Sequence, residues 1–170
     1  MPNEFPIEES RPGRESFFCG PDVKGEGEGG WEYSHLRPCL VTHNGSLQAQ
    51  LRVLDCQYAE TFLKVWHWPG QEYYFNIEFS YEINYLDALS QKAPPTSSGI
   101  TVGKGVISTT AQGEGKEVKN GKSHTISNPG WYLLSGIYKA KLERGAAWED
   151  YGLTISYNEK FHIDCIGKVA

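Results

Sequence analysis

The sequence predicts an all-β protein, an antiparallel β-sandwich of the jelly-roll type, with a closed β-barrel as the second choice. The first observation is the run 73–85, where aromatic or branched side chains alternate with polar ones, as in a strand with one buried face. The second is a series of further short runs rich in strand-forming residues, separated by turn residues. The third is that no segment has the length of a stable helix, so the crossovers of a parallel sheet are not expected.

The first predicted unit is a flexible Gly- and Pro-rich arm at residues 1–30. Ten of its thirty residues are glycine or proline, and the run KGEGEGG at 24–30 is expected to sustain neither helix nor strand. Phe17 and Phe18 are the exceptions, because they are placed to pin the arm to the body. Residues 31–170 are then predicted to form a single β domain, since a chain of this length fits one core.

The body of the chain contains the predicted strands in order. The run 73–85 directs its rings and branched side chains to one face, and Asn76, Glu78, Ser80, Glu82 and Asn84 to the other. Further strands are predicted at 47–54, 58–66, 100–110, 115–119, 122–126, 131–142, 151–157 and 160–166. Two hairpin turns are predicted at Asn44-Gly45 and Asn120-Gly121, because a type I′ turn needs positive φ at both central residues.

The net charge of −5 is unevenly distributed along the chain. Residues 1–30 hold seven acids and three bases, a charge of −4, whereas the other residues hold fourteen acids and thirteen bases, a charge of −1. A phosphate backbone is bound by clustered Lys and Arg, so nucleic-acid binding is not predicted.

The sequence also bears on localisation. No stretch reaches the ~20 apolar residues that span a bilayer, and the N-terminus MPNEFPIEES lacks the basic and apolar regions of a secretory signal. The chain is therefore expected in the cytosol, or as a mature or non-classically exported form. Contact with a membrane stays open.

The four cysteines are Cys19, Cys39, Cys56 and Cys165. They form no C-x-x-C pair, so neither a structural zinc site nor any other metal site is predicted. The even count allows two disulfides or free buried thiols. In an extracellular protein, the expected bridge joins Cys165 to Cys39 or Cys56, because all three lie on predicted strands.

The most unusual composition lies at 65–74, which reads Val-Trp-His-Trp-Pro-Gly-Gln-Glu-Tyr-Tyr. On a strand, Trp66 and Trp68 share one face and His67 lies on the other. Exposed rings beside polar groups suit sugar binding, because the apolar face of a pyranose stacks on a ring and nearby polar groups bind its hydroxyls. The alternative is that the indoles belong to the core. The predicted ligand-binding residues are Trp31, Trp66, His67, Trp68, Glu72 and Tyr74.

Acid–base candidates are present without any nucleophile motif, so no catalytic residue is assigned. Glu78 and Glu82 share a strand face, but their backbones are roughly 13 Å apart on an extended chain. Paired glycosidase carboxylates lie only about 5–9.5 Å apart. His162 and Asp164 share a face of the last strand, where a carboxylate can orient an imidazole. The weak candidates are Glu72, Glu78, Glu82, His162 and Asp164, and a solvated strand face is the alternative for each.

These observations rank three functions. The first is a non-catalytic, lectin-like module that binds a glycan or another small polar ligand through its aromatic residues. The second is a small β-sandwich or barrel enzyme of glycosidase or isomerase type. The third is a structural or membrane-acting β-sandwich, such as a coat subunit or a pore-former. No cofactor is predicted, and a homo-oligomer stays open.

Overall fold

A computed structural model describes most of the chain as β strand. The described residues are 16–27, 32–60, 65–69, 74–87, 100–112, 116–143 and 152–163. They contain no helix long and apolar enough to cross a membrane. The strands are β1 (Ser16–Cys19), β2 (Val23–Glu26), β3 (Glu32–His43), β4 (Ser46–Glu60), β5 (Val65–His67), β6 (Tyr74–Asp87), β7 (Ile100–Ala111), β8 (Glu117–Asn120), β9 (His124–Thr125), β10 (Gly130–Glu143) and β11 (Leu153–Ile163).

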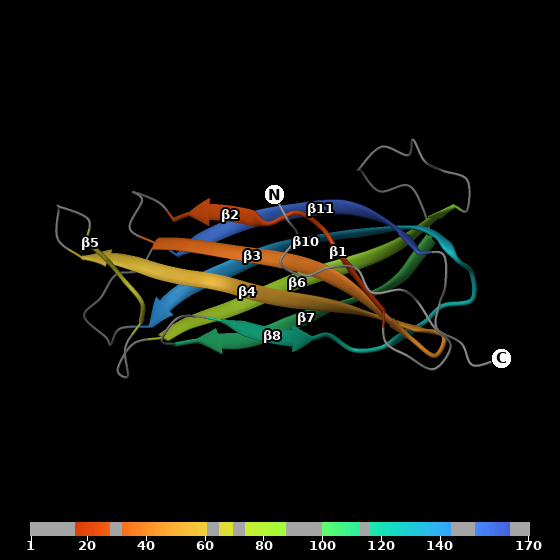
Figure 1. The fold of residues 1–170 in the computed structure, drawn as a ribbon, viewed down its shortest axis with the longest axis horizontal. Coiled ribbons are helices and arrows are strands. Elements are labelled where there is room, and N and C mark those ends of the chain that lie inside the picture. Colours follow the sequence, from red (N-terminus) through yellow and green to blue (C-terminus); the bar gives the residue numbers. More distant parts are fainter. Residues whose placement is uncertain are drawn as a thin grey trace.

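The strands form two antiparallel sheets, which run along the long axis of the molecule (Figure 1). In sheet A, β3 and β4 are central: β1 and β2 pair with β3, while β5, β8 and β9 pair with β4. Sheet B has the order β11-β10-β6-β7. The predicted all-β antiparallel sandwich is confirmed. Over the described residues the two sheets stay separate, so the barrel alternative does not apply.

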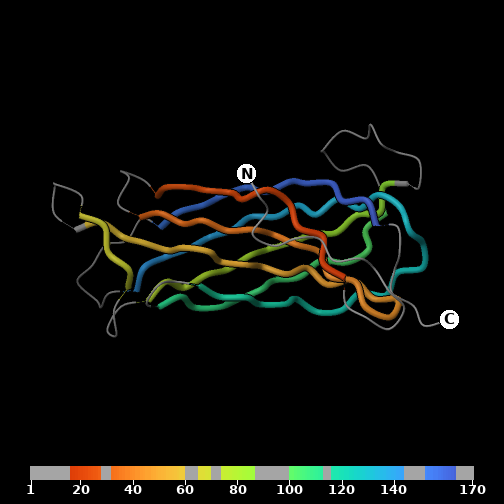
Figure 2. Tube along the Cα trace, in the orientation of Figure 1, coloured from red at the N-terminus to blue at the C-terminus, as the bar shows by residue number. Residues whose placement is uncertain are grey.

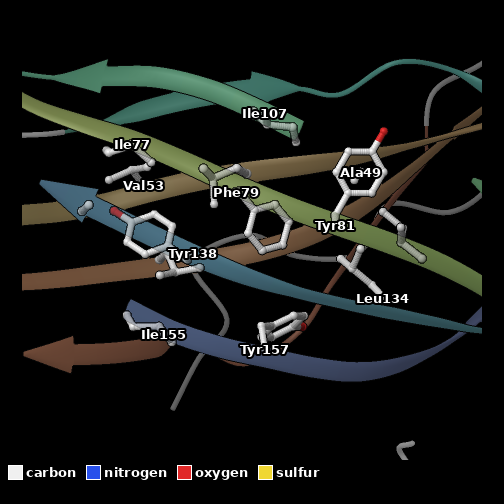
Figure 3. Packing of buried hydrophobic residues seen from close by; sticks show 14 of the residues in the cluster. Ala49, Val53, Ile77, Phe79, Tyr81, Ile107, Leu134, Tyr138, Ile155 and Tyr157 are labelled. Atoms are coloured by element: carbon white, nitrogen blue, oxygen red, sulfur yellow. The ribbon is translucent and has the colours of Figure 1, made fainter. Parts of the chain in front are cut away.

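The alternation of the run 73–85 is reproduced in β6, which supplies one side of the core. Its inward rings and branched chains are buried, and its outward side chains up to Ser80 are exposed. Figure 3 shows Phe79, Tyr81 and Tyr138 packed with aliphatic side chains from both sheets. Truncation of a buried ring such as Phe79 costs about 3–5 kcal/mol, so this packing is a main source of stability. The buried side chains of β6 are Phe75, Ile77, Phe79, Tyr81 and Ile83.

Asn84 departs from the predicted polar face. It is buried, whereas Asn76, Glu78 and Ser80 are exposed. The register between β6 and β7 shifts just before Asn84, and the hydroxyl of Thr101 lies 3.1 Å from its Oδ1. The Thr101 hydroxyl thus binds the amide oxygen, while the buried Nδ2 has no hydrogen-bond partner among the described residues.

The hairpin predicted at Asn44-Gly45 is confirmed. Asn44 has φ 50° and Gly45 has φ 80°, and His43 pairs with Ser46 across the turn. Positive φ at both central residues is what this turn requires, and glycine adopts it without strain. The turn sets the register between β3 and β4.

The hairpin predicted at Asn120-Gly121 is wrong. β8 and β9 do not pair with each other, since both pair with β4. Asn120 lies opposite Gln50 and His124 lies opposite Leu47, so residues 121–123 face only Gln48 and Ala49. This excess of one residue is a β-bulge in an interrupted edge strand, and it uses the Asn-Gly pair instead of a turn.

A second bulge lies in β4. His35 pairs with Asp55, but the next residue of β3, Leu36, pairs with Val53. Leu54 is therefore the extra residue. Beyond it, Asp55 and Gln57 point to the outer face of sheet A, while Cys56 and Tyr58 point into the core.

Residues 16–27 belong to sheet A, although this part of the chain was expected to carry no regular structure after residue 24. β1 and β2 both pair with β3, as Figure 2 shows for the red segment. Phe18 is 7% exposed and lies in the core, as predicted for a residue that pins the arm. The polar run Lys24–Glu26 forms a strand because β3 supplies its backbone partners. Residues 28–31 lie outside the described residues, and the boundary predicted at 31 falls there.

The cysteine pairing differs from the expected one. Cys19 and Cys39 lie directly opposite each other on β1 and β3 and form a disulfide. Cys56 is a free, buried thiol, and Cys165 lies outside the described residues. The Cys56 Sγ lies 3.2 Å from Oγ of Ser34, and burial raises its pKa to about 11. The sequence placed the bridge on the wrong partner because the strand β1 was not predicted.

Glycines allow close contact where the two sheets meet at β7 and β9. A Cβ on Gly103 would lie 2.0 Å from Nδ1 of His124, and one on Gly121 would lie 3.0 Å from the ring of Tyr81. A contact of 2.0 Å is too short for carbon and nitrogen, so a side chain at position 103 would require the His124 ring to move. At position 121 the Tyr81 ring would have to shift by a few tenths of an ångström. Gly103 thus allows the two sheets to pack closely.

Candidate functional site

An exposed aromatic group lies at one end of sheet A. It is built on the short edge strand β5, which pairs with the last residues of β4 (Figure 1). The Trp66 side chain is 39% exposed and the Trp68 side chain 51% exposed, so the alternative that both indoles are core residues is wrong. We call this group the tryptophan site and define it as Tyr33, Asp55, Gln57, Trp66 and Trp68.

The rings of the tryptophan site are held by neighbours in sheet A. Trp66 meets Tyr33 edge-on, with the ring centroids 6.3 Å apart at an angle of 72°. The indole Nε1 of Trp68 donates a hydrogen bond of 2.9 Å to Oδ1 of Asp55. Gln57 Nε2 donates one of 2.7 Å to Oδ2 of the same carboxylate. Both indoles are therefore oriented, while much of their surface faces solvent.

His67 lies on the opposite face of β5, as strand alternation predicts. It pairs with Tyr58, and the two rings lie 5.7 Å apart. Tyr58 is buried in the core, so the contact ties β5 to the interior. His67 itself is exposed, but it does not share the surface of Trp66 and Trp68.

Negative charge gathers around Tyr33. Burial raises the pKa of its phenol, and the carboxylates of Asp55, Asp22 and Glu26 raise it further. The negative charge of Asp22 is compensated, because its carboxylate pairs with Arg37 and lies 2.9 Å from Nε2 of His35. These partners hold the pKa of Asp22 below its ordinary value, although burial opposes them.

Three further predicted ligand-binding residues are Trp31, Glu72 and Tyr74. Trp31 and Glu72 lie outside the described residues. Tyr74 is exposed, but it lies on sheet B at the start of β6, opposite Glu143. Among the described members of the predicted set, the structure thus brings Trp66 and Trp68 together and places His67 and Tyr74 elsewhere.

The outer face of sheet B carries an open polar groove. One part, of about 680 Å³, is lined by polar side chains together with the exposed Val106 and Ile137. A second part, of about 630 Å³, lies along Asn76, Glu78 and Lys139. Of the predicted polar face, Asn76, Glu78, Ser80 and Glu82 line the groove, whereas Asn84 is buried and lines neither part.

The carboxylates of this groove have no acidic partner across the strands. Each of Glu78 and Glu82 stands between one serine and one lysine on the neighbouring strands. These cross-strand neighbours are Ser108 and Lys139 for Glu78, and Lys104 and Ser135 for Glu82. Neither Glu78 nor Glu82 therefore has a carboxylate directly opposite it on a neighbouring strand.

His162 lines neither part of the groove and is not in the tryptophan site. It lies opposite Trp131 on sheet B, with the ring centroids 4.9 Å apart. Lys160 lies over the same indole, 5.7 Å from its centre. Asp164 and Glu72 lie outside the described residues, so the predicted pairing of His162 with Asp164 stays a prediction.

Sequence reasoning missed Tyr33, Asp55 and Gln57, which complete the tryptophan site. The Asn44-Gly45 turn was the available signal, because it fixes β3 against β4 and brings residues near 33 and 56 together. The bulge at Leu54 then shifts the pairing by one residue, and no local pattern announces it.

Comparisons of the chain with protein-family models, with curated proteins and with solved structures give no match.

Proposed function

We propose that this protein is a non-catalytic carbohydrate-binding module whose ligand stacks on the tryptophan site. The observation that carries the proposal is the exposure of Trp66 and Trp68 on one strand face, each anchored by a neighbour. A pyranose ring has an apolar face that stacks on an indole, and its hydroxyls bind amides and carboxylates. Gln57 and Asp55 lie beside the rings and supply those groups.

Binding is favoured over catalysis because of the surroundings of the acidic groups. Glu78 and Glu82 lie in an open groove and are flanked by serine and lysine. A glycosidase needs two carboxylates that flank the scissile bond. The tryptophan site holds one carboxylate, Asp55, which is engaged by two donors.

A glycan is favoured over a lipid surface because of charge. Exposed tryptophans also occur at membrane interfaces, but anionic leaflets attract surfaces rich in Lys and Arg. Here the carboxylates of Asp55 and Glu26 lie near the rings. They would oppose binding to anionic lipid.

The test is titration of the protein with a panel of oligosaccharides, followed by tryptophan fluorescence and calorimetry. We expect a saturable fluorescence shift with at least one glycan. Trp66→Ala and Trp68→Ala should each weaken binding about tenfold or more, since stacking on one ring contributes about 1–3 kcal/mol.

Trp131→Ala is the matched control, because it removes an indole on sheet B that stacks on His162. It should leave glycan affinity unchanged. Loss of binding in Trp131→Ala but not in Trp66→Ala would move the site to sheet B. Binding to liposomes in place of glycans would contradict the proposal in favour of a membrane role.

A further inference from the structure

The carboxylate of Asp55 lies beside the exposed indole of Trp68. Its two oxygens accept hydrogen bonds from Trp68 Nε1 at 2.9 Å and from Gln57 Nε2 at 2.7 Å. Both donors are neutral, so they orient the carboxylate without cancelling its charge. A charge held in this way favours a positively charged partner.

A second source of negative charge lies on the neighbouring strand. Glu26 is directly opposite Tyr33 on β2, and its carboxylate acts on the Tyr33 phenol. The bases nearby are His35 and Arg37, which pair with Asp22, and Lys24, which lies opposite His35. Glu26 therefore lies in the row of Tyr33, next to the rings. Asp55 lies in the row of His35 and reaches the rings through its hydrogen bond to Trp68.

The rings themselves attract cations. An ammonium group over the face of tryptophan or tyrosine, within about 6 Å of the ring centre, interacts favourably with the π electrons. The Tyr33 and Trp66 rings meet edge to face, so their planes differ by 72° and form two walls of a corner. Exposed indole and a fixed carboxylate together form the usual surroundings of a bound organic cation.

We propose that the tryptophan site binds a glycan carrying a free, positively charged amino group, as in an oligosaccharide of 2-amino sugars. Asp55 faces the ammonium group, and the indoles of Trp66 and Trp68 stack on the sugar rings. This inference rests on the proposed function and specifies its ligand class.

The experiment compares three tetrasaccharides that share one β-1,4 backbone: the glucosamine tetramer, its fully N-acetylated form and the glucose tetramer. Calorimetric titration gives the Kd of each. We expect the glucosamine tetramer to bind about tenfold more tightly than the two neutral ones, which corresponds to one favourable cation–π and carboxylate contact. The preference should shrink as salt is raised, because screening weakens charge contacts.

The variant Asp55→Asn removes the negative charge of the side chain and keeps its size and shape. The asparagine keeps an oxygen to accept the Trp68 hydrogen bond, so the indole stays in place. We expect this variant to bind all three tetramers with the affinity of the neutral ones. Glu78→Gln on sheet B is the matched control and should keep the preference. Salt dependence of the wild-type preference gives an independent reading if Asp55→Asn folds poorly.

The outcomes distinguish the two proposals. Equal affinity of the wild type for the three tetramers, or a preference that Asp55→Asn retains, overturns the charged-ligand inference and leaves carbohydrate binding standing. Absence of binding to these tetramers and to the wider glycan panel overturns both.

Discussion

The hydroxyl of Tyr81 and Nε2 of His124 share a hydrogen bond of 2.9 Å that joins β6 of sheet B to β9 of sheet A. The rings meet edge to face, 6.0 Å apart. Gly103 leaves room for the imidazole, and Gly121 leaves room for the phenol. This hydrogen bond therefore joins the two sheets at the edge where β7 lies against β8 and β9. The two glycines leave the space that lets the rings meet.

The first prediction concerns pH. Burial lowers the pKa of His124, and the ammonium of Lys122 lowers it further. The unfolded chain then takes up a proton more readily than the folded one. The free energy of unfolding should therefore fall as the pH drops below the ordinary histidine pKa of about 6.5 toward the lower folded value. Urea unfolding on both sides of that pH measures it.

Two variants assign this effect to the histidine. His124→Gln should lose less stability than the wild type over the same pH interval. His162→Gln, which alters an exposed histidine on sheet B, should behave as the wild type does. Equal losses in the wild type and in His124→Gln would show that other groups carry the pH dependence.

The second prediction concerns Gly103. A methyl group there would overlap the His124 ring, with the closest atom at 2.0 Å. Gly103→Ala should lower the free energy of unfolding by about 1–3 kcal/mol, the usual cost of overpacking. Lys104→Ala, at the exposed neighbouring position, should change it little.

A double-mutant cycle tests whether the His124 ring causes this loss of stability. In His124→Ala the ring is absent, so adding Gly103→Ala should cost much less than it does in the wild type. Chemical denaturation of the four proteins completes the cycle. If the alanine costs as much without the ring as with it, the steric explanation fails.

The third prediction concerns the Cys19–Cys39 disulfide, which closes a loop with a sequence separation of 20. Cys19→Ser with Cys39→Ser should lower the free energy of unfolding by about 3 kcal/mol, mainly because the unfolded chain gains freedom. The same loss should follow when the wild type is reduced. Peptide mapping without reductant should recover the two cysteines as one linked pair.

Cys56 is the internal control for that experiment. Its thiol is buried, and burial raises its pKa to about 11, so little thiolate exists near neutral pH. An alkylating reagent should modify Cys56 only when the protein unfolds. A mapped peptide in which Cys56 is linked to Cys19 or Cys39 would contradict the pairing. Rapid alkylation of Cys56 in the native protein would contradict its burial.

Local patterns in the sequence predicted local structure well. The alternation of 73–85 specified which side chains of β6 are buried, because strand periodicity depends on adjacent residues only. The Asn44-Gly45 turn was predictable for the same reason. Asn120-Gly121 has equal turn character but lies in a bulge, since its flanking segments have a stronger partner in β4.

Features that depend on distant pairing were not predictable. β3 is buried on both faces from Leu36 to Thr42, so its sequence does not alternate and the bounds of this strand were not predicted. Gly25 reads as loop-forming, yet it lies in β2 where a Cβ would meet Ile155 at 2.5 Å. For the same reason, the sequence did not predict that Tyr33 and Asp55 belong to one site. Their proximity depends on the pairing of β3 with β4 and on the bulge in β4.

Leu54 is the extra residue of β4, because the neighbouring residues His35 and Leu36 of β3 pair with Asp55 and Val53. If the ladder ran regularly through Leu54, strand alternation would turn Asp55 and Gln57 inward and direct Cys56 and Tyr58 to solvent. The outward position of Asp55 therefore depends on Leu54 being accommodated as a bulge. Deletion of Leu54 would give a regular ladder with the same sidedness, and substitutions at Leu54, which is half-buried, also leave the sidedness of the strand intact.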